Sequence, residues 1–350
     1  NWSATPTGIQ IGPATTIHIC GTITGTAGST ALTFQGDGSV GNPVTLLFET
    51  GALLTNTYWS TSTAAIYGGS SRNYIVIDGG SNGTIQNTAN GSSPTYPNSQ
   101  DSGGVYFPIC NHCEIKNLNV INLFVKNTTD GQGGGDAIDI HAGSNNSIHN
   151  NLIHDTQIGI IMNFGNDTTT QTGDSIYSNT IYHFNHAVAV GDSSTSHTFS
   201  GLLIYNNEMY DAVNWDDLST NNFHHNGVFV FTNNSGNTIS GLKIYNNYIH
   251  GDMGTRETGH IFLDNEDSTS STYTGTLIFN NLLVDNSATN GPSNGFIITK
   301  DNKTGSVVNI YNNTMYFTTN VGSRCTMDQG AALLLQNNAN YQCGDALYVP

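Results

Sequence analysis

The phrase SIHNNLIHD at residues 147–155 recurs along the chain and decides its fold. Further copies are SIYSNTIYH (175–183), LIYNNEMYD (203–211), KIYNNYIHG (243–251), LIFNNLLVD (277–285), NIYNNTMYF (309–317) and a weaker one, EIKNLNVIN (114–122). Each full copy carries an isoleucine at its second position, and these lie 28, 28, 40, 34 and 32 residues apart: Ile148, Ile176, Ile204, Ile244, Ile278 and Ile310. A fixed phrase at a variable spacing indicates a repeat whose loops differ in length.

A second phrase falls between the copies and predicts a short strand in each repeat. Its copies are GGVYFP (103–108), DAIDIH (136–141), IGIIMN (158–163), HAVAVG (186–191), NGVFVF (226–231), GHIFLD (259–264), NGFIIT (294–299) and AALLLQ (331–336). Side chains of such strands alternate between two faces. No segment has a helical periodicity. A propeller blade needs four strands in about 40 residues, so repeats of 28 residues favour a coil of stacked parallel rungs.

The paired asparagines in the first phrase predict a tight bend on every rung. Asparagine tolerates the left-handed backbone conformation that such a bend requires. We expect the stacked residues Asn206, Asn246, Asn280 and Asn312 to form a ladder of side-chain amides. The isoleucines of the phrase would then fill the interior of the coil.

The phrase I-x-x-N-x-[ILM], after a G-[IV]-x-[IVLF] strand, resembles the pectate-lyase-like superfamily of right-handed parallel β-helices over roughly residues 60 to 340. The resemblance implies an all-β fold, a single-stranded right-handed parallel β-helix (a solenoid) of about 9–11 rungs. We predict one domain over residues 1–350: an N-terminal cap with the first rungs (1–60), regular rungs (61–318), and a last rung with a disulfide-stapled cap (319–350). Superfamily members include polysaccharide lyases, glycoside hydrolases, epimerases, tailspikes and adhesins, so the resemblance implies a fold rather than one function.

The composition narrows the function classes. Eight Lys and Arg against 25 Asp and Glu give a formal net charge of −17, which argues against nucleic acid. A polyuronate substrate is also disfavoured, because it usually needs a basic cleft. No apolar run of 18 residues occurs, so we expect no membrane span. The chain begins Asn1-Trp2-Ser3 and reads as already processed.

The cysteines and sequons indicate a secreted, extracellular protein. We expect Cys325 and Cys343 to form a disulfide near the end of the chain. Cys110 and Cys113 form either a local disulfide or half of a metal site. Nine Asn-x-Ser/Thr sequons make the chain a candidate glycoprotein; they start at Asn1, Asn82, Asn90, Asn127, Asn145, Asn166, Asn233, Asn302 and Asn312.

The strands of the second phrase present two predicted outward columns, where enzymes of the superfamily usually carry their sites. The first column is Tyr106, Asp139, Ile161, Ala189, Phe229, Phe262, Ile297 and Leu334. The second column is Pro108, His141, Asn163, Gly191, Phe231, Asp264, Thr299 and Gln336. The predicted inward partners are apolar and include Phe296 and Ile298.

Rung spacing excludes one tempting carboxylate pair. Rungs stack about 4.8 Å apart, so Asp139 and Asp264, four rungs apart, are separated by roughly 19 Å. Glycosidase carboxylates lie about 5–9.5 Å apart. We therefore place the candidate site in residues 252–301 and the loop before it. The catalytic candidates are Asp264, Glu266, Asp301, Glu257 and Lys300. The substrate-binding candidates are Phe229, Phe231, Phe262, Trp215, Arg256, His260 and His224.

Two further patterns have alternative interpretations. A Ca²⁺-dependent polysaccharide lyase could use Lys300 or Arg256 as base, with the ion held by Asp264, Glu266 and Asp267; otherwise we expect no cofactor. A second cluster, Asp136, Asp139 and His141, follows the glycine-rich segment GQGGGD (131–136). No helix follows to bind phosphate, so we interpret these glycines as a loop that bends tightly over the strand.

Carboxylates beside aromatic side chains favour cleavage of a neutral or weakly acidic polysaccharide by a glycoside hydrolase-like enzyme. The opposing hypothesis is a non-catalytic structural or adhesive β-helix, such as a filament or surface-appendage subunit capable of self-assembly. Either would have a polysaccharide or cell-surface glycan as its partner, and neither needs nucleic acid. An enzyme should show an open groove across Phe229, Phe262 and Asp264, whereas a structural subunit should have that face covered.

Overall fold

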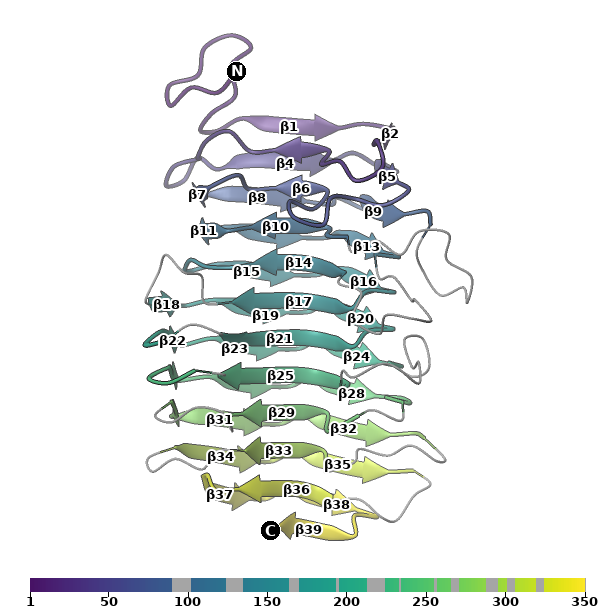
Figure 1. Ribbon diagram of the computed structural model, residues 1–350, viewed down its shortest axis with the longest axis vertical. Helices are drawn as coiled ribbons and strands as arrows, with labels where there is room; N and C mark the ends of the chain where they lie inside the picture. The colour runs from purple at the N-terminus through teal and green to yellow at the C-terminus, as the bar shows by residue number, and fades with distance from the viewer. Residues whose placement is uncertain are drawn as a thin grey trace.

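The chain forms a long parallel coil in which every rung adds one strand to each of three sheets (Figure 1). The computed structural model describes residues 1–89, 102–123, 135–163, 170–192, 195–212, 224–232, 234–254, 257–265, 271–287, 295–300, 306–318 and 324–349. Each of the three long sheets has eleven strands, and neighbouring strands pair in parallel. The predicted right-handed parallel β-helix of 9–11 rungs is therefore confirmed, with eleven rungs.

The strands are named here by the sheet to which they belong. The first sheet contains β1 (Thr16–Ile19), β4 (Val44–Phe48), β8 (Ile75–Asp78), β12 (Glu114–Lys116), β15 (Ser147–His149), β19 (Ser175–Tyr177), β23 (Leu203–Tyr205), β27 (Lys243–Tyr245), β31 (Thr276–Phe279), β34 (Val307–Tyr311) and β37 (Ala332–Gln336). The second sheet contains β2 (Thr22–Thr24), β5 (Leu53–Asn56), β9 (Thr84–Asn87), β13 (Asn119–Ile121), β16 (Leu152–His154), β20 (Thr180–Tyr182), β24 (Glu208–Tyr210), β28 (Tyr248–His250), β32 (Leu282–Asp285), β35 (Thr314–Phe317) and β38 (Ala339–Tyr341).

The third sheet carries the predicted outward columns. Its strands are β3 (Leu32–Thr33), β6 (Ile66–Tyr67), β10 (Val105–Phe107), β14 (Asp136–Ile140), β17 (Ile158–Asn163), β21 (His186–Asp192), β25 (Asn226–Thr232), β29 (Ile261–Asp264), β33 (Ile297–Lys300), β36 (Arg324–Gln329) and β39 (Asp345–Tyr348). A short bend sheet contains β18 (Thr170–Thr172), β22 (Thr198–Ser200), β26 (Thr238–Ser240) and β30 (Thr272–Thr274), and β7 (Ser71–Asn73) pairs with β11 (Ile109–Asn111). The described residues include no helix that could cross a membrane.

The interior of the coil is one continuous apolar core. The six isoleucines of the repeat phrase are all fully buried, as predicted. On the outer surface of the first sheet, rings at equivalent positions stack face to face from His149 through Tyr177, Tyr205, Tyr245 and Phe279 to Tyr311, with centroids 4.5–5.0 Å apart. Parallel in-register strands place identical positions one rung apart, which is the spacing that ring stacking needs.

The asparagine ladder exists, but the second asparagine of each pair builds it. Asn206, Asn246, Asn280 and Asn312 have positive φ angles near 55° and make the bend, as expected. Their chain neighbours point inward and are buried. The backbone N–H and Nδ2 of Asn207 both donate to Oδ1 of Asn247, at 3.1 and 3.0 Å. The same pattern repeats along the coil through Asn151, Asn179, Asn207, Asn247, Asn281, Asn313 and Asn338.

Four members of the predicted outward columns are wrong: Ile297, Thr299, Leu334 and Gln336. Phe262 neighbours Ile298 rather than Ile297, and Asp264 neighbours Lys300 rather than Thr299. Consequently Ile297 and Thr299 point inward, and Ile298 packs outside the coil against Phe262. The phrase AALLLQ, with Leu334 and Gln336, lies in β37 of the first sheet, so the tenth strand of the third sheet is β36. A one-residue slip is invisible in a run such as Phe296-Ile297-Ile298, because both registers bury an apolar residue.

Both predicted disulfides are present, Cys325–Cys343 and Cys110–Cys113. The second pair is therefore a local disulfide and not half of a metal site.

Replacing Asn247 by alanine should lower the free energy of unfolding by about 3 kcal/mol, because it removes buried hydrogen bonds to Ile204, Asn207 and Asn281. Urea denaturation followed by circular dichroism measures the loss. Asn246→Gly is the matched control, since glycine adopts the left-handed bend freely and should change stability by less than about 0.5 kcal/mol. Equal losses for the two variants would contradict the assignment of the ladder to the second asparagine.

Candidate functional site

The outward column of the third sheet changes from polar to apolar along the coil. In register order it reads Tyr67, Tyr106, Asp139, Ile161, Ala189, Phe229, Phe262, Ile298, Met327 and Tyr348. The polar end of this column therefore lies on β6, β10 and β14. Asp139 and Phe262 are four rungs apart in this sheet, which confirms the separation expected for Asp139 and Asp264.

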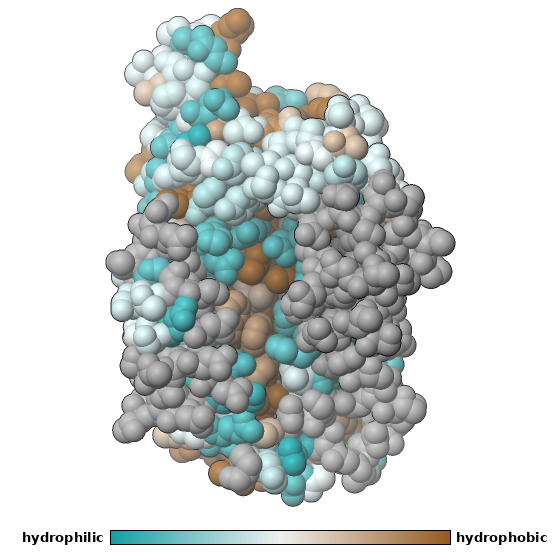
Figure 2. All heavy atoms as spheres, viewed as in Figure 1, coloured by the Kyte–Doolittle hydropathy of each residue, from teal (hydrophilic) through white to brown (hydrophobic). Residues whose placement is uncertain are grey.

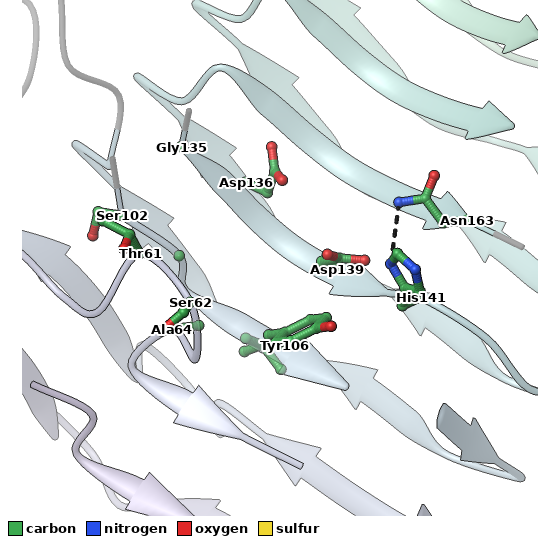
Figure 3. A pocket seen from close by; sticks show the side chains of 12 residues that line it. Thr61, Ser62, Ala64, Ser102, Tyr106, Gly135, Asp136, Asp139, His141 and Asn163 are labelled. Carbon is green, nitrogen blue, oxygen red and sulfur yellow. Dashed lines mark hydrogen bonds between the residues drawn. The ribbon is translucent and has the colours of Figure 1, made fainter. Parts of the chain in front are cut away.

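A cavity of about 350 Å³ opens over this polar end (Figure 3). Tyr106, Asp136, Asp139, His141 and Asn163 come from three neighbouring strands or their ends and line one wall. The remaining lining residues are small, and all except Val105 lie outside the strands: Thr61, Ser62, Ala64, Ser102, Gly103, Val105 and Gly135. We call this cavity the β14 pocket. The residues that line it include two carboxyl groups and neither Lys nor Arg.

Asp139 is the most perturbed group of the β14 pocket. Its Oδ1 is shielded from solvent and has no hydrogen-bond partner among the described residues. Burial raises the pKa of Asp139 well above its usual range, and the nearby charge of Asp136 raises it further. A carboxyl group in such surroundings holds its proton to a higher pH than an exposed aspartate does, which suits Asp139 to donate a proton to a bound molecule.

Tyr106 stands directly beside Asp139 on the preceding rung. Burial, followed by the charges of Asp139 and Tyr67, raises the pKa of Tyr106 to about 12. The phenol therefore stays protonated and acts as a hydrogen-bond donor or acceptor, not as a ready base. Its ring meets the His141 ring edge to face, with centroids 6.3 Å apart.

His141 is fixed on several sides at the end of β14. Its backbone N–H donates to the Phe107 carbonyl at 2.8 Å, and its ring Nδ1 lies 3.5 Å from Nδ2 of Asn163. The next turn is braced by the Cys110–Cys113 disulfide, since the Cys110 N–H donates to the Ala142 carbonyl at 2.8 Å. The imidazole is thereby oriented at the wall of the pocket (Figure 3).

The apolar part of the column continues away from the β14 pocket, and a stripe of apolar residues runs down the face seen in Figure 2. Phe229 contacts Phe231 and Phe262 with ring centroids 5.0 and 5.4 Å apart, and His224 packs edge to face on Phe229. Phe229 and Phe231 are half-buried. Phe262 is only 3% exposed, so the face expected to be an open groove is largely covered at that residue.

The structure brings several sequence-predicted site residues together on this stripe. Asp264 neighbours Lys300 in register, and Lys300 Nζ lies 5.7 Å above the Phe262 ring. Burial lowers the pKa of His224, and the neighbouring charges of His225 and Lys300 lower it further. The region therefore combines one carboxylate, one ammonium and several aromatic rings.

Glu257 and His260 lie inside the coil, not on its surface. Both side chains are enclosed and form an ion pair with each other. Burial alone would lower the pKa of His260, but Glu257 and then Asp285 raise it above its ordinary value. The His260 ring packs edge to face on Phe296 at 4.7 Å. In this arrangement neither side chain reaches a surface that a glycan could contact.

The predicted residues Trp215, Arg256, Glu266, Asp267 and Asp301 lie outside the described residues. In the part of the chain that the structure describes, no three His, Cys, Asp or Glu side chains gather as metal ligands. The Ca²⁺ hypothesis rested on Glu266 and Asp267 together with Asp264, so two of its three ligands fall outside that part.

The sequence places Asp139, His141 and Asn163 in the outward columns and Asp136 directly after a glycine-rich loop, but none of the four was predicted to be a site residue. The available signal was a run of polar residues on three consecutive rungs: Tyr106 on the first, Asp139 with His141 on the second, and Asn163 on the third. The small residues of the facing wall, such as Thr61 and Ser102, carried no signal because they come from irregular connections between rungs.

Comparison with known proteins supports the fold and does not identify a family. No protein-family model and no curated protein matches this sequence. Among solved structures, an alginate lyase from Paenibacillus sp. str. FPU-7 is similar, with a TM-score of 0.53 and 12% identity over 97% of this chain and 92% of that one. The A-module of the mannuronan C-5 epimerase AlgE4 from Azotobacter vinelandii has a TM-score of 0.51 and 13% identity over 96% and 89% of the two chains.

The Streptococcus pneumoniae surface protein and adhesin PfbA is similar to the same degree, with a TM-score of 0.51 and 13% identity over 94% of this chain and 91% of that one. The chain thus has a right-handed parallel β-helix fold, as the repeat phrase implied.

The Asp139 carboxyl should lower the free energy of unfolding as the pH rises above the ordinary pKa of an aspartate. A carboxyl whose folded pKa is raised contributes least stability at high pH, because the unfolded chain then releases a proton that the folded chain retains. Asp139→Asn should therefore gain stability relative to the wild type as the pH rises above about 4, the ordinary pKa of an aspartate. Urea denaturation at several pH values measures the difference, and a difference independent of pH would contradict the burial of a protonated Asp139.

Proposed function

We propose that this chain is a secreted carbohydrate-active protein that cleaves a neutral or weakly acidic polysaccharide in the β14 pocket. One observation carries the proposal: Asp136 and Asp139 both line the same cavity, and the surroundings of Asp139 favour its protonated form. A carboxyl group of raised pKa beside a second carboxyl is the arrangement that glycoside hydrolysis uses. The two disulfides support secretion.

The proposed reaction divides the work between the two carboxyl groups. Asp139 gives its proton to the glycosidic oxygen as the bond to the anomeric carbon breaks, so that the leaving sugar departs with a hydroxyl. Asp136 accepts a proton from the water that attacks the anomeric carbon. Three residues along a strand separate their Cα atoms by about 10 Å. Side chains leaning toward each other across this spacing can hold their carboxyl groups about 6.5–9.5 Å apart, which leaves room for a water molecule and corresponds to inversion of the anomeric configuration.

The other groups of the β14 pocket suit sugar hydroxyls. The Tyr106 phenol remains protonated, and Ser62, Ser102 and Thr61 add small hydroxyl groups to the cavity. The lining residues carry no positive side chain, which favours a substrate without a high density of carboxylates. Phe229 and Phe231, half-buried about three rungs from Asp139, offer ring surface to a longer chain.

A second candidate reaction is abstraction of the C5 proton of a uronate, as in a lyase or an epimerase. It is favoured by the presence of His141 and Tyr106 in the β14 pocket and by the similarity of the fold to an alginate lyase and a mannuronan C-5 epimerase. In this reaction a neutral Asp139 would donate a hydrogen bond to the uronate carboxylate instead of repelling it. His141 would take the proton from C5.

The hypothesis of a cluster centred on Asp264 and Lys300 also stays a proposal, and so does a non-catalytic adhesive role, which the fold similarity to an adhesin supports. These alternatives differ in which carboxyl group matters. They also differ in whether a bound glycan is changed.

Purified protein should be incubated with a panel of neutral glycans and with alginate and pectate. The products are measured as new reducing ends, as the ultraviolet absorbance of unsaturated uronates, and by NMR for epimerisation. We expect new reducing ends from a neutral or weakly acidic glycan. Asp139→Asn and Asp136→Asn should each lower the rate by at least about 100-fold, while Asp264→Asn should leave it within about twofold of the wild type.

The same panel separates the alternatives. Unsaturated or epimerised uronates that disappear in a His141→Gln variant would replace hydrolysis by proton abstraction. Loss of activity in Asp264→Asn but not in Asp139→Asn would move the site to the aromatic stripe. Glycan binding without any product, measured by calorimetry, would assign the chain to the adhesive class.

A further inference from the structure

One buried residue beneath the β14 pocket breaks the pattern of its neighbours. The central positions of the bend sheet point into the core and, in register order, are Gln171, Phe199, Ile239 and Tyr273. All four side chains are at most 1% exposed. On the next two rungs a large apolar side chain, Phe199 or Ile239, fills this position. Packing therefore does not require a polar side chain here, and the amide of Gln171 must serve another purpose.

The amide of Gln171 connects the two strand ends that carry the wall of the pocket. Its Nε2 donates to the backbone carbonyl of Asn163 and, at 3.4 Å, to the backbone carbonyl of His141. Asn163 is the last residue of β17, and His141 directly follows β14. Since the His141 N–H is already held by Phe107, both backbone polar groups of His141 are fixed.

This connection has a structural cost. Gln171 Oε1 is buried and has no hydrogen-bond partner among the described residues. A buried polar atom without a partner destabilises a fold. A methionine or leucine would fill the same space without that cost, as Phe199 and Ile239 do on the following rungs.

We propose that Gln171 is a positioning residue for the β14 pocket: it holds the His141 and Asn163 backbones so that the His141 imidazole and the Asn163 amide keep their mutual orientation beside Asp139. The proposal rests on the proposed function of this pocket for its catalytic consequence. The orientation itself is a property of the unliganded protein and can be measured without any substrate.

Tyr273 provides a matched control at the equivalent position three rungs away. Its hydroxyl donates to the backbone carbonyls of Val230 and Asp264, at 3.1 and 3.2 Å. It thus makes the same kind of contact at the end of β29 that Gln171 makes at the end of β14. Tyr273→Phe removes that contact without approaching the β14 pocket.

The experiment compares Gln171→Met and Tyr273→Phe with the wild type. The imidazole nitrogen resonances of His141, assigned by their absence in His141→Gln, report its tautomer and its titration. In Gln171→Met we expect these resonances to shift and the apparent pKa of His141 to change by at least about half a unit. With substrate, kcat should fall about 10- to 100-fold while KM changes less than about threefold, and Tyr273→Phe should change none of these quantities.

If Gln171→Met unfolds, Gln171→Leu removes the amide with a more compact apolar side chain and should shift the His141 resonances in the same way. Unchanged His141 resonances in a folded Gln171 variant would overturn the proposal, and so would an equal change in Tyr273→Phe. A wild type that acts on no glycan would refute the proposed function alone, because the His141 resonances would still decide whether Gln171 orients the ring.

Discussion

The asparagine ladder is the constraint on which the rest of the coil depends. At each bend between the first and second sheets the backbone turns away from its regular pairing, and its N–H group would be left in the core without an acceptor. The inward asparagine of the next rung supplies that acceptor through Oδ1, and its Nδ2 donates to the carbonyl of the isoleucine on the preceding rung. One asparagine per rung thus satisfies three backbone or side-chain amide groups. The asparagine before it in the chain adopts the left-handed conformation, and this bend points the ladder asparagine inward.

Register follows from this ladder, and the candidate site follows from register. Because every rung repeats the same bend, equivalent positions on the third sheet stack directly above one another, and a polar residue on one rung meets its counterpart on the next. Tyr106 and Asp139 become neighbours in this way although 33 positions separate them in the sequence. The low dielectric between closely packed rungs then shifts their pKa values upward. Side chains that are ordinary in water thereby become weaker acids in this column.

The fold could be predicted from the sequence because it repeats, and repetition averages out errors at single positions. The buried isoleucines, the bends at Asn206 and its counterparts and the Asp139–Asp264 separation were all predicted correctly. Prediction was wrong where two residues compete for one role. Both asparagines of a pair could build the ladder, and both Ile297 and Ile298 could point inward. The β14 pocket could not be predicted as a cavity, because its facing wall is formed by irregular connections that follow no period.

The stacked tyrosines of the first sheet have a consequence for how this molecule behaves in solution. Their ring faces are occupied by one another, so water meets ring edges and hydroxyl groups along that side of the coil. A chain with so few charged residues would ordinarily expose adhesive aromatic surface. Here the rings are stacked face to face, and the tyrosine hydroxyl groups at their edges bind water without carrying charge. Because these hydroxyl groups bind water without carrying charge, added salt screens their hydration little.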